Sequence, residues 1–208
     1  MHRAHSDKQT AILDAAQKRF SFYGLTKVTM DEIAEDLGIS KAALYYYFPA
    51  KEELFRQVIA RRHNEFFDLV EDANKTIQIA GEKILRYFQL YLAFFNKLLN
   101  LNLVNLNTVD IIHPIIKILF VEFTKKEYDL IESILHEGKK NNEFKIDSPQ
   151  KTTVLLQHVM QGLRMRFFKA ARNRDLEEFD IKMYENDIRL FAKIFLIGIG
   201  FPAENACL

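Results

Sequence analysis

The sequence predicts an all-α fold. Only seven glycines and four prolines interrupt its 208 residues. Apolar residues recur at helical spacing through most of the chain. Apolar residues make up 49% of the sequence and the formal net charge is +1, a composition typical of a soluble globular protein. We therefore expect a bundle-like protein of about nine helices.

The first helix is expected to begin near Ser6 and to end at Gly24. Ser6 and Gln9 have the spacing of a capping box. Gly24 stands where a glycine commonly closes a helix. The face between them that is expected to be buried carries Ile12, Ala15, Ala16 and Phe20.

Residues 29–48 predict two further short helices joined by a tight turn. Thr29 and Glu32 form a second capping-box pattern. Gly38 stands at the turn, where a positive φ costs glycine nothing. Ser40 is a good N-cap for the helix that follows. With the first helix, these segments make a three-helix domain that contains a helix-turn-helix.

The last of these three helices directs an unusual set of residues outward. Leu44 and Phe48 are four apart and share the face expected to point inward. The residues left outside are Lys41, Ala42, Ala43, Tyr45, Tyr46 and Tyr47. Small side chains allow close approach to base edges in a DNA major groove, and hydroxyl or ammonium groups can bond phosphates. The alternative is an ordinary helical hairpin whose tyrosines cover a neighbouring domain.

Caps, turn and core residues agree in register from residue 24 to residue 55. They are Gly24, Val28-Thr29-Met30, Ile33-Ala34, Leu37-Gly38-Ile39-Ser40-Lys41-Ala42, Leu44-Tyr45-Tyr46-Tyr47-Phe48-Pro49 and Lys51-Glu52-Glu53-Leu54-Phe55. This pattern resembles the N-terminal domain of the TetR family of bacterial transcription regulators over roughly residues 8–59. The resemblance implies a homodimer that binds a palindrome-like operator in double-stranded DNA, with the second helix of the pair in the major groove.

The resemblance also implies roles for individual residues. It places Thr29 and Tyr46 on phosphates, Lys41 and Ala42 near bases, Tyr45 and Tyr47 at the groove, Lys51 on the DNA backbone, and Ser40 and Ala43 at the start of the reading helix. Two positions depart from the family. Ala50 stands where a serine is common, which loses an N-cap and costs about 1 kcal/mol. Ala43 replaces a residue that is often polar, so direct base readout is expected to be poorer.

We expect residues 1–50 to form the DNA-binding domain and residues 51–208 a helical ligand-binding and dimerisation domain. A helix from residue 51 to about residue 72 would link the two. Further helices are expected around the apolar run 84–99 and over 123–140, 147–172 and 177–199, with a short one broken at His113-Pro114. The alternating run 100–107 is interpreted as a helix end and a loop. The last two helices carry more large apolar residues than a monomer needs, which favours a homodimer through a four-helix seam.

The sequence offers little catalytic chemistry. His63, His113, His136 and His158 lack metal-ligand spacing, so no metal site is predicted. No nucleophile motif or cofactor-binding loop occurs, and we expect neither a catalytic residue nor a cofactor. The single cysteine, Cys207, fits a reducing cytoplasm. The run 190–201 is too short to span a bilayer, so no membrane partner is expected.

The aromatic residues in the middle of the chain suggest a small-molecule pocket, although a plain core is the more frequent outcome. Such a pocket is mostly apolar with a few placed polar groups. The candidate residues are Tyr87, Tyr91, Phe95, His113, Phe120, Gln157, Gln161 and Arg164. By the family resemblance the ligand would be a hydrophobic effector, such as an acyl chain or an aromatic compound, that releases a repressor from its operator. The alternative function is an enzyme or a carrier that holds a lipid-like molecule in the same bundle.

Overall fold

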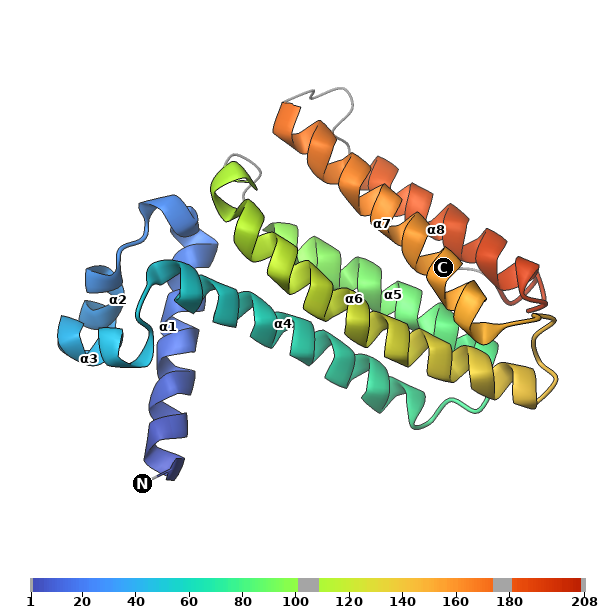
Figure 1. The fold of residues 1–208 in the computed structure, drawn as a ribbon, viewed down its shortest axis with the longest axis horizontal. Helices are drawn as coiled ribbons and strands as arrows, with labels where there is room; N and C mark the ends of the chain where they lie inside the picture. Colours follow the sequence, from blue (N-terminus) through green and yellow to red (C-terminus); the bar gives the residue numbers. More distant parts are fainter. Residues whose placement is uncertain (1, 101–108, 174–180, 207–208) are drawn as a thin grey trace. The chain divides into compact units, whose positions relative to one another are not determined.

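Eight α-helices make up the part of the chain that the structure describes. The computed structural model describes residues 2–100, 109–173 and 181–206, with side chains described for residues 7–97, 118–167 and 181–206. The helices, labelled in Figure 1, are α1 (His2–Lys27), α2 (Met30–Asp36), α3 (Lys41–Tyr47), α4 (Lys51–Asn74), α5 (Ala80–Asn100), α6 (Val109–Lys140), α7 (Pro149–Asn173) and α8 (Ile181–Gly198). Within these ranges there is no strand, and the predicted all-α fold is confirmed.

The described residues form eight helices, close to the expected number of about nine, and α6 is continuous where a break was expected. The sequence predicts a break at His113-Pro114, whereas α6 runs through this dipeptide from Val109 to Lys140. Pro114 lies only five positions after the start of α6, so its missing N–H removes a single bond near one end. Most of the helix lies beyond the proline. The alternating residues 101–107 and the expected start of the last helix at residue 177 lie outside the described residues.

The chain divides into two compact units. The first comprises residues 1–65 and 96–119, and the second comprises residues 66–95 and 120–208. Helices α4, α5 and α6 contribute residues to both units. The domain boundary expected after residue 50 stays a prediction. No helix in the described part of the chain is long and apolar enough to cross a membrane.

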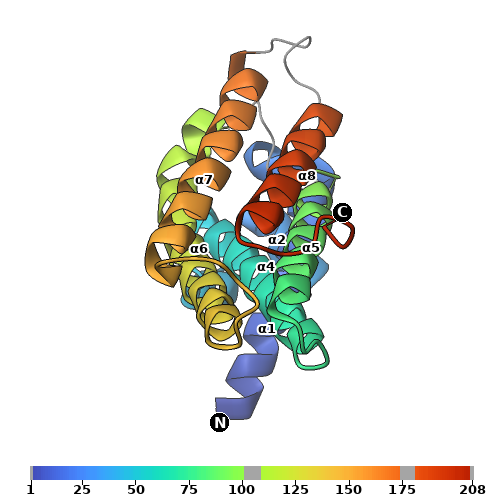
Figure 2. The same cartoon turned by 90° about the vertical axis from the view of Figure 1, so that its right-hand side faces the viewer.

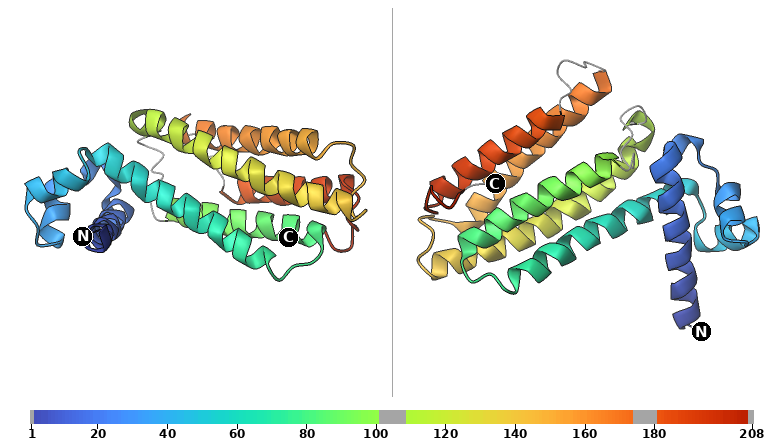
Figure 3. Two further views of the ribbon diagram at one scale, coloured as in Figure 1. Left: turned by 60° about the horizontal axis from the view of Figure 1, so that its bottom comes forward. Right: turned by 180° about the vertical axis from the view of Figure 1, so that it is seen from behind.

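In the first unit, α1 supports the two short helices α2 and α3, which Figure 3 shows from two sides. Helix α1 begins at His2, before the predicted cap at Ser6, and is interrupted at Gly24, whose φ is 74°. Phe20 of α1 is fully buried and meets Phe55 of α4 edge-on, with ring centroids 5.3 Å apart. This contact holds the end of α1 against the first turns of α4.

In the second unit, α5, α6, α7 and α8 lie side by side, with α7 beside α6 and α8 beside α5 (Figure 2). Helix α7 begins as the sequence predicts. Pro149 is its first residue, and the Ser148 hydroxyl accepts a hydrogen bond from the Lys151 N–H at 3.3 Å. The core between the helices is rich in aromatic rings, with Phe88 of α5 edge-on to Phe191 and Phe195 of α8.

Candidate functional site

The turn between α2 and α3 is fixed by local interactions. The Thr29 hydroxyl accepts a hydrogen bond from the Glu32 N–H at 3.3 Å, and the Glu32 carboxylate accepts one from the Thr29 N–H at 2.8 Å. This is the predicted capping box. Gly38 has a φ of 60°, as the turn requires. The Ser40 hydroxyl caps α3 by accepting the Ala43 N–H at 3.1 Å.

Helix α3 is anchored by one apolar face. Leu44 is fully buried and Phe48 nearly so, as their spacing predicts. Phe48 has an extended backbone (φ −136°, ψ 103°), the conformation that a following proline favours. The helix therefore ends at Tyr47, two residues before Pro49, and its opposite face is left to the solvent.

The outward face of α3 is exposed. Lys41 and Ala42 are exposed, and the exposed fractions of Tyr45 and Tyr46 are 40% and 76%. Ala43 and Tyr47 are half-buried. The rings of Tyr46 and Tyr47 meet edge-on, with centroids 5.3 Å apart. This face can approach a large partner, as the DNA-binding interpretation requires.

Ion pairs surround this face in the free protein. Lys41 Nζ lies 2.9 Å from a carboxylate oxygen of Asp31 in α2, and this hydrogen bond raises the pKa of Lys41. On the other side of α2, Arg19 Nε donates to Asp36 at 2.6 Å and lowers the pKa of that carboxyl. A DNA phosphate would have to compete with Asp31 for Lys41.

Lys51 and Thr29, both predicted to touch the DNA backbone, also have partners within the protein. Lys51 Nζ donates to the backbone carbonyl of Val28 at 2.9 Å and is half-buried. The Thr29 side chain is exposed but belongs to the capping box. In the free protein, these two side chains position α2 and α4.

A second group of polar side chains lies inside the second unit, where α5, α6 and α7 meet. Glu127 of α6 is 0% exposed and Arg164 of α7 is 5% exposed. The Tyr87 hydroxyl of α5 donates to Glu127 Oε1, and Arg164 Nη2 lies 3.4 Å from Glu127 Oε2. Burial, together with the neighbouring Glu127 carboxylate, raises the pKa of Tyr87 well above its usual value, so its hydroxyl stays protonated and donates.

Aromatic side chains enclose this polar group. The guanidinium carbon of Arg164 lies 4.8 Å from the ring centroid of Phe120, 5.5 Å from that of Phe123 and 5.9 Å from that of Tyr91. The hydroxyls of Tyr91 and Tyr184 are hydrogen-bonded to each other at 2.8 Å. Burial raises the pKa of both tyrosines. We call Tyr87, Tyr91, Glu127, Arg164 and Tyr184 the buried polar cluster.

The structure brings together most of the residues predicted to bind a ligand. Tyr87, Tyr91 and Arg164 belong to the buried polar cluster, and Phe120 packs on Arg164. Phe95 is buried, and its ring centroid lies 4.6 Å from that of Tyr184. The side chain of His113 lies outside the described residues.

The two predicted glutamines are less central. Gln157 donates to the backbone carbonyl of Thr124 at 2.6 Å, so it links α7 to α6. Gln161 is half-buried, and no described contact joins it to the cluster. Both side chains remain candidates at the edge of the aromatic region.

Sequence reasoning missed Glu127 and Tyr184. A signal for Glu127 was available, because it falls in helical phase with Phe123 and Ile131 on the apolar stripe of α6. A carboxylate at a core position indicates a buried partner. Nothing in the local sequence of Tyr184 marks its hydroxyl as bonded to Tyr91.

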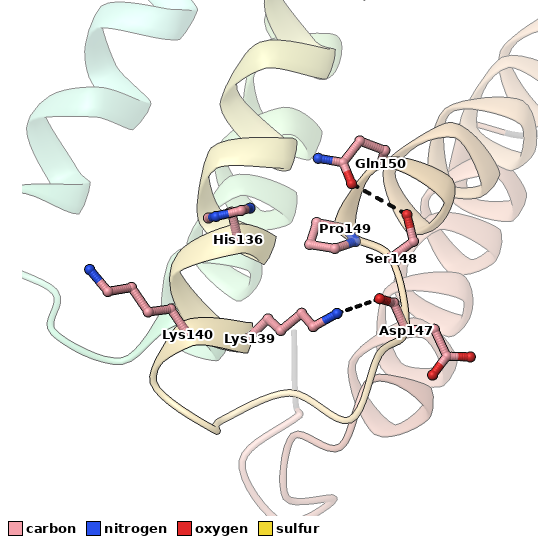
Figure 4. Close-up of a pocket in the computed structure, with 7 residues that line it drawn as sticks. All are labelled: His136, Lys139, Lys140, Asp147, Ser148, Pro149 and Gln150. Carbon is pink, nitrogen blue, oxygen red and sulfur yellow. Dashed lines mark hydrogen bonds between the residues drawn. The ribbon is translucent and has the colours of Figure 1, made fainter.

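A surface pocket of about 440 Å³ lies where α6 ends and α7 begins (Figure 4). Its lining residues are His136, Lys139, Lys140, Asp147, Ser148, Pro149 and Gln150. None of the predicted ligand-binding residues lines it, and its place on the surface among exposed charged side chains such as Lys139, Lys140 and Asp147 does not suit a hydrophobic effector. In the described part of the chain, no group of three or more His, Cys, Asp or Glu side chains could hold a metal ion.

Comparison with known proteins links the first unit to transcriptional regulators. Residues 12–58 match the family described as bacterial regulatory proteins, tetR family. A segment of 57 residues is 47% identical to the regulator RutR of Escherichia coli K12, and it covers 27% of each chain. A segment of 59 residues is 37% identical to IcaR of Staphylococcus epidermidis, a negative transcriptional regulator of a biofilm operon, and covers 28% of this chain and 32% of that one. The chain thus matches less than a third of the length of either curated relative.

A solved structure extends the likeness to nearly the whole chain. The crystal structure of a transcriptional regulator from Cytophaga hutchinsonii is 34% identical to this chain, with a TM-score of 0.79. The match covers 92% of this chain and 98% of that one. These three proteins are transcriptional regulators.

Proposed function

Because the chain belongs to the tetR family of bacterial regulatory proteins, we propose that it is a sequence-specific DNA-binding transcriptional repressor that acts in the cytoplasm. The observation that carries the proposal is the outward face of α3. Its anchors Leu44 and Phe48 are buried, while Lys41, Ala42 and Tyr46 are exposed. A short helix presented in this way fits a DNA major groove.

Residues of α3 and its surroundings would have different roles in DNA binding. Ala42 allows the helix backbone close to the bases, and its methyl group suits the methyl of a thymine. Tyr46, Thr29 and Lys51 would bond phosphates, which position the helix without reading sequence. Since only a few side chains can read bases, we expect modest base discrimination and an affinity that falls steeply with salt.

We propose that two copies of the chain pair through α7 and α8. These helices expose an apolar surface made of Val154, Leu155, Met165, Leu190, Ile194 and Ile197. Leu155 and Met165 share one face of α7, and a Cβ added to Gly162 between them would meet nothing within 4 Å. A glycine at an open position allows a second helix to come close. A two-fold dimer would present two α3 helices to a palindrome-like operator, about 34 Å or somewhat more apart.

We further propose that a hydrophobic small molecule releases the repressor by binding in the second unit. Support comes from the aromatic side chains around the buried polar cluster, among them Phe95, Phe120 and Phe123. A ligand shifts the equilibrium between two states only by its differential affinity for them. Helix α4, which contributes residues to both units, would carry the change to the DNA-binding helices.

The close approach of α3 to DNA can be tested with Ala42→Leu. Leucine is a good helix former, so the exposed substitution should leave the midpoint of thermal unfolding almost unchanged. It should lower the affinity for DNA from the chain's own upstream region by about tenfold or more, measured by a mobility-shift titration. The matched control is Ala93→Leu, at an exposed alanine of α5. Wild-type affinity in Ala42→Leu would remove the close-approach model.

A further inference from the structure

Arg164 has more hydrogen-bond donors than its surroundings can accept. A guanidinium carries five N–H groups. Arg164 Nη2 approaches Glu127 at 3.4 Å and the guanidinium also bonds the Tyr91 hydroxyl, but Nε has no hydrogen-bond partner in the described part of the chain. Yet Arg164 is buried, with only 5% of its surface exposed to solvent. A buried donor without an acceptor is costly and therefore indicates a missing partner.

The described neighbours of Arg164 leave its Nε without an acceptor. The ring faces of Phe120, Phe123 and Tyr91 attract a cation but give its N–H groups no conventional acceptor. Of the two hydroxyls in the Tyr91–Tyr184 pair, one donates to the other, so one O–H proton is left over. The carboxylate of Glu127 already accepts the Tyr87 hydroxyl. The cluster thus lacks an acceptor beside Nε.

We propose that the effector is an organic acid whose carboxylate binds Arg164 and whose body is apolar or aromatic. This inference rests on the proposed ligand-controlled regulator and names the chemical class of its ligand. A carboxylate offers two oxygens in the plane of a guanidinium and forms the strong, charge-assisted pair that arginine favours. An organic cation fits less well, because it would bring no acceptor to the spare donors.

The aromatic surroundings define where the body of the acid would lie. Phe95, Phe167 and Tyr184 come from three different helices and pack against one another with centroids 4.6–5.1 Å apart. Phe120 and Phe94 are half-buried, so the apolar region reaches the surface of the second unit. If these three rings move apart to admit the body of the acid, their contacts with one another are replaced by contacts with the acid.

Binding of an acid would alter the contact between α6 and α7. The incoming carboxylate competes with Glu127 for one guanidinium, and the existing 3.4 Å contact is long for a charged pair. Arg164 would move toward the ligand, and Glu127 would keep its bond from Tyr87. The acid therefore prefers the state in which α7 is released from Glu127, which is the differential affinity that regulation requires.

The test uses the full-length protein and probes of matched shape. Decanoate and 4-phenylbutyrate are the acids, 1-decanol and 4-phenyl-1-butanol are their neutral counterparts, and decyltrimethylammonium is the cation. Affinities are measured by isothermal titration calorimetry, and thermal unfolding is followed in parallel. At least one acid should bind about tenfold or more tightly than its alcohol, the effect of one charge-assisted hydrogen bond. Equal affinities for acid and alcohol, no binding of either acid, or tighter binding of the cation would overturn the proposal.

Two substitutions at the cluster should act in opposite directions. Arg164→Gln should reduce acid binding about tenfold or more, with alcohol binding unchanged. Glu127→Gln should strengthen acid binding, because it removes the competing carboxylate. If Glu127→Gln does not fold, Arg164→Lys is the second variant, and it should retain charge but lose part of the affinity through loss of the planar fork. The matched control is Arg166→Gln, an exposed arginine on the same helix, which should bind acids like the wild type. Acid affinity that stays unchanged in Arg164→Gln would contradict the assignment.

The same samples separate this inference from the proposed function. A mobility shift of upstream DNA by ligand-free protein tests the regulator alone. DNA binding without acid binding would overturn only the ligand class. Acid binding without DNA binding would overturn the regulator and leave the Arg164 site standing.

Discussion

In the proposed DNA complex, Lys41 of α3 would exchange a partner within the protein for a DNA phosphate. In the free protein its ammonium group is bonded to Asp31, and both side chains are well exposed. An exposed pair of this kind is worth only about 0–1 kcal/mol. A DNA phosphate would therefore displace Asp31 at little cost, and in the proposed complex this ion pair would slightly weaken the affinity of α3 for DNA.

Because Asp31 competes with DNA for Lys41, we predict that the Asp31→Asn variant binds DNA more tightly than the wild type. The substitution frees Lys41 and removes one negative charge beside the DNA, so we expect a two- to fivefold gain, consistent with about 0–1 kcal/mol. Glu35→Gln is the matched control, because this exposed carboxylate of α2 has no ion-pair partner among the described residues. Equal gains in the two variants would assign the effect to charge alone and not to Lys41.

At the level of single residues, the sequence predicted local chemistry better than long-range chemistry. Thr29, Glu32 and Gly38 were identified because each satisfies its own neighbours within a few positions. The bond from Lys51 to Val28 and the burial of Glu127 depend on residues 23 and 37 positions away or more. A sequence pattern shows which residues are neighbours along one helix, but it does not show which residues of two distant helices meet. Such pairs can therefore be identified only in the folded structure.

At the level of elements, the sequence predicted most helices and failed where one signal was given too much weight. The start of α7 follows from Ser148 and Pro149, and the end of α3 from Pro49. Pro114 was expected to break a helix, but a proline near the start of a long helix costs one bond that the remaining turns can offset. The start of α1 was misplaced for a related reason, since a capping pattern at Ser6 does not prevent the helix from beginning before it, whereas the expected helix end at Gly24 coincides with the interruption there.

Helix α4 is tied to α1 by Arg61, and this tie is testable. Arg61 Nη1 lies 2.7 Å from Asp14 and Nη2 lies 2.8 Å from the side-chain oxygen of Gln17. Arg61→Ala should destabilise the contact between α1 and α4 by about 1 kcal/mol, since the partners are partly exposed. Amide hydrogen exchange in α1 should then speed up about fivefold.

The neighbouring arginine supplies the control for that measurement. Arg62 lies next in the same helix and pairs with Glu65 of α4 at 2.6 Å. Arg62→Ala removes an equal charge without detaching α1, so exchange in α1 should remain near the wild-type rate. Unchanged exchange in Arg61→Ala would show that apolar contacts such as Phe20 with Phe55 hold α1 without help.

For the molecule as a whole, the exposed apolar surface of α7 and α8 is the proposed contact between two copies of the chain. Leu190, Ile194 and Ile197 follow one another at helical spacing on the open side of α8. A stripe of large exposed apolar side chains on two adjacent helices is more than a monomer usually leaves in water. The sequence predicted a seam here from an excess of apolar residues, but it could not specify which of them lie outside the core.

Pairing through this surface predicts that Ile194→Asp produces a monomer. In a two-fold interface each substitution appears twice, and a carboxylate placed in an apolar seam is unpaired. The dissociation constant of the dimer should rise about 100-fold or more, which analytical ultracentrifugation of the 24.4 kDa chain resolves. Operator affinity should fall with it, because a monomer holds one half-site. Leu69→Asp is the matched control: Leu69 lies on α4 and is 59% exposed, against 60% for Ile194. A dimeric Ile194→Asp, or equal loss in the Leu69 variant, would place the contact between copies on another surface.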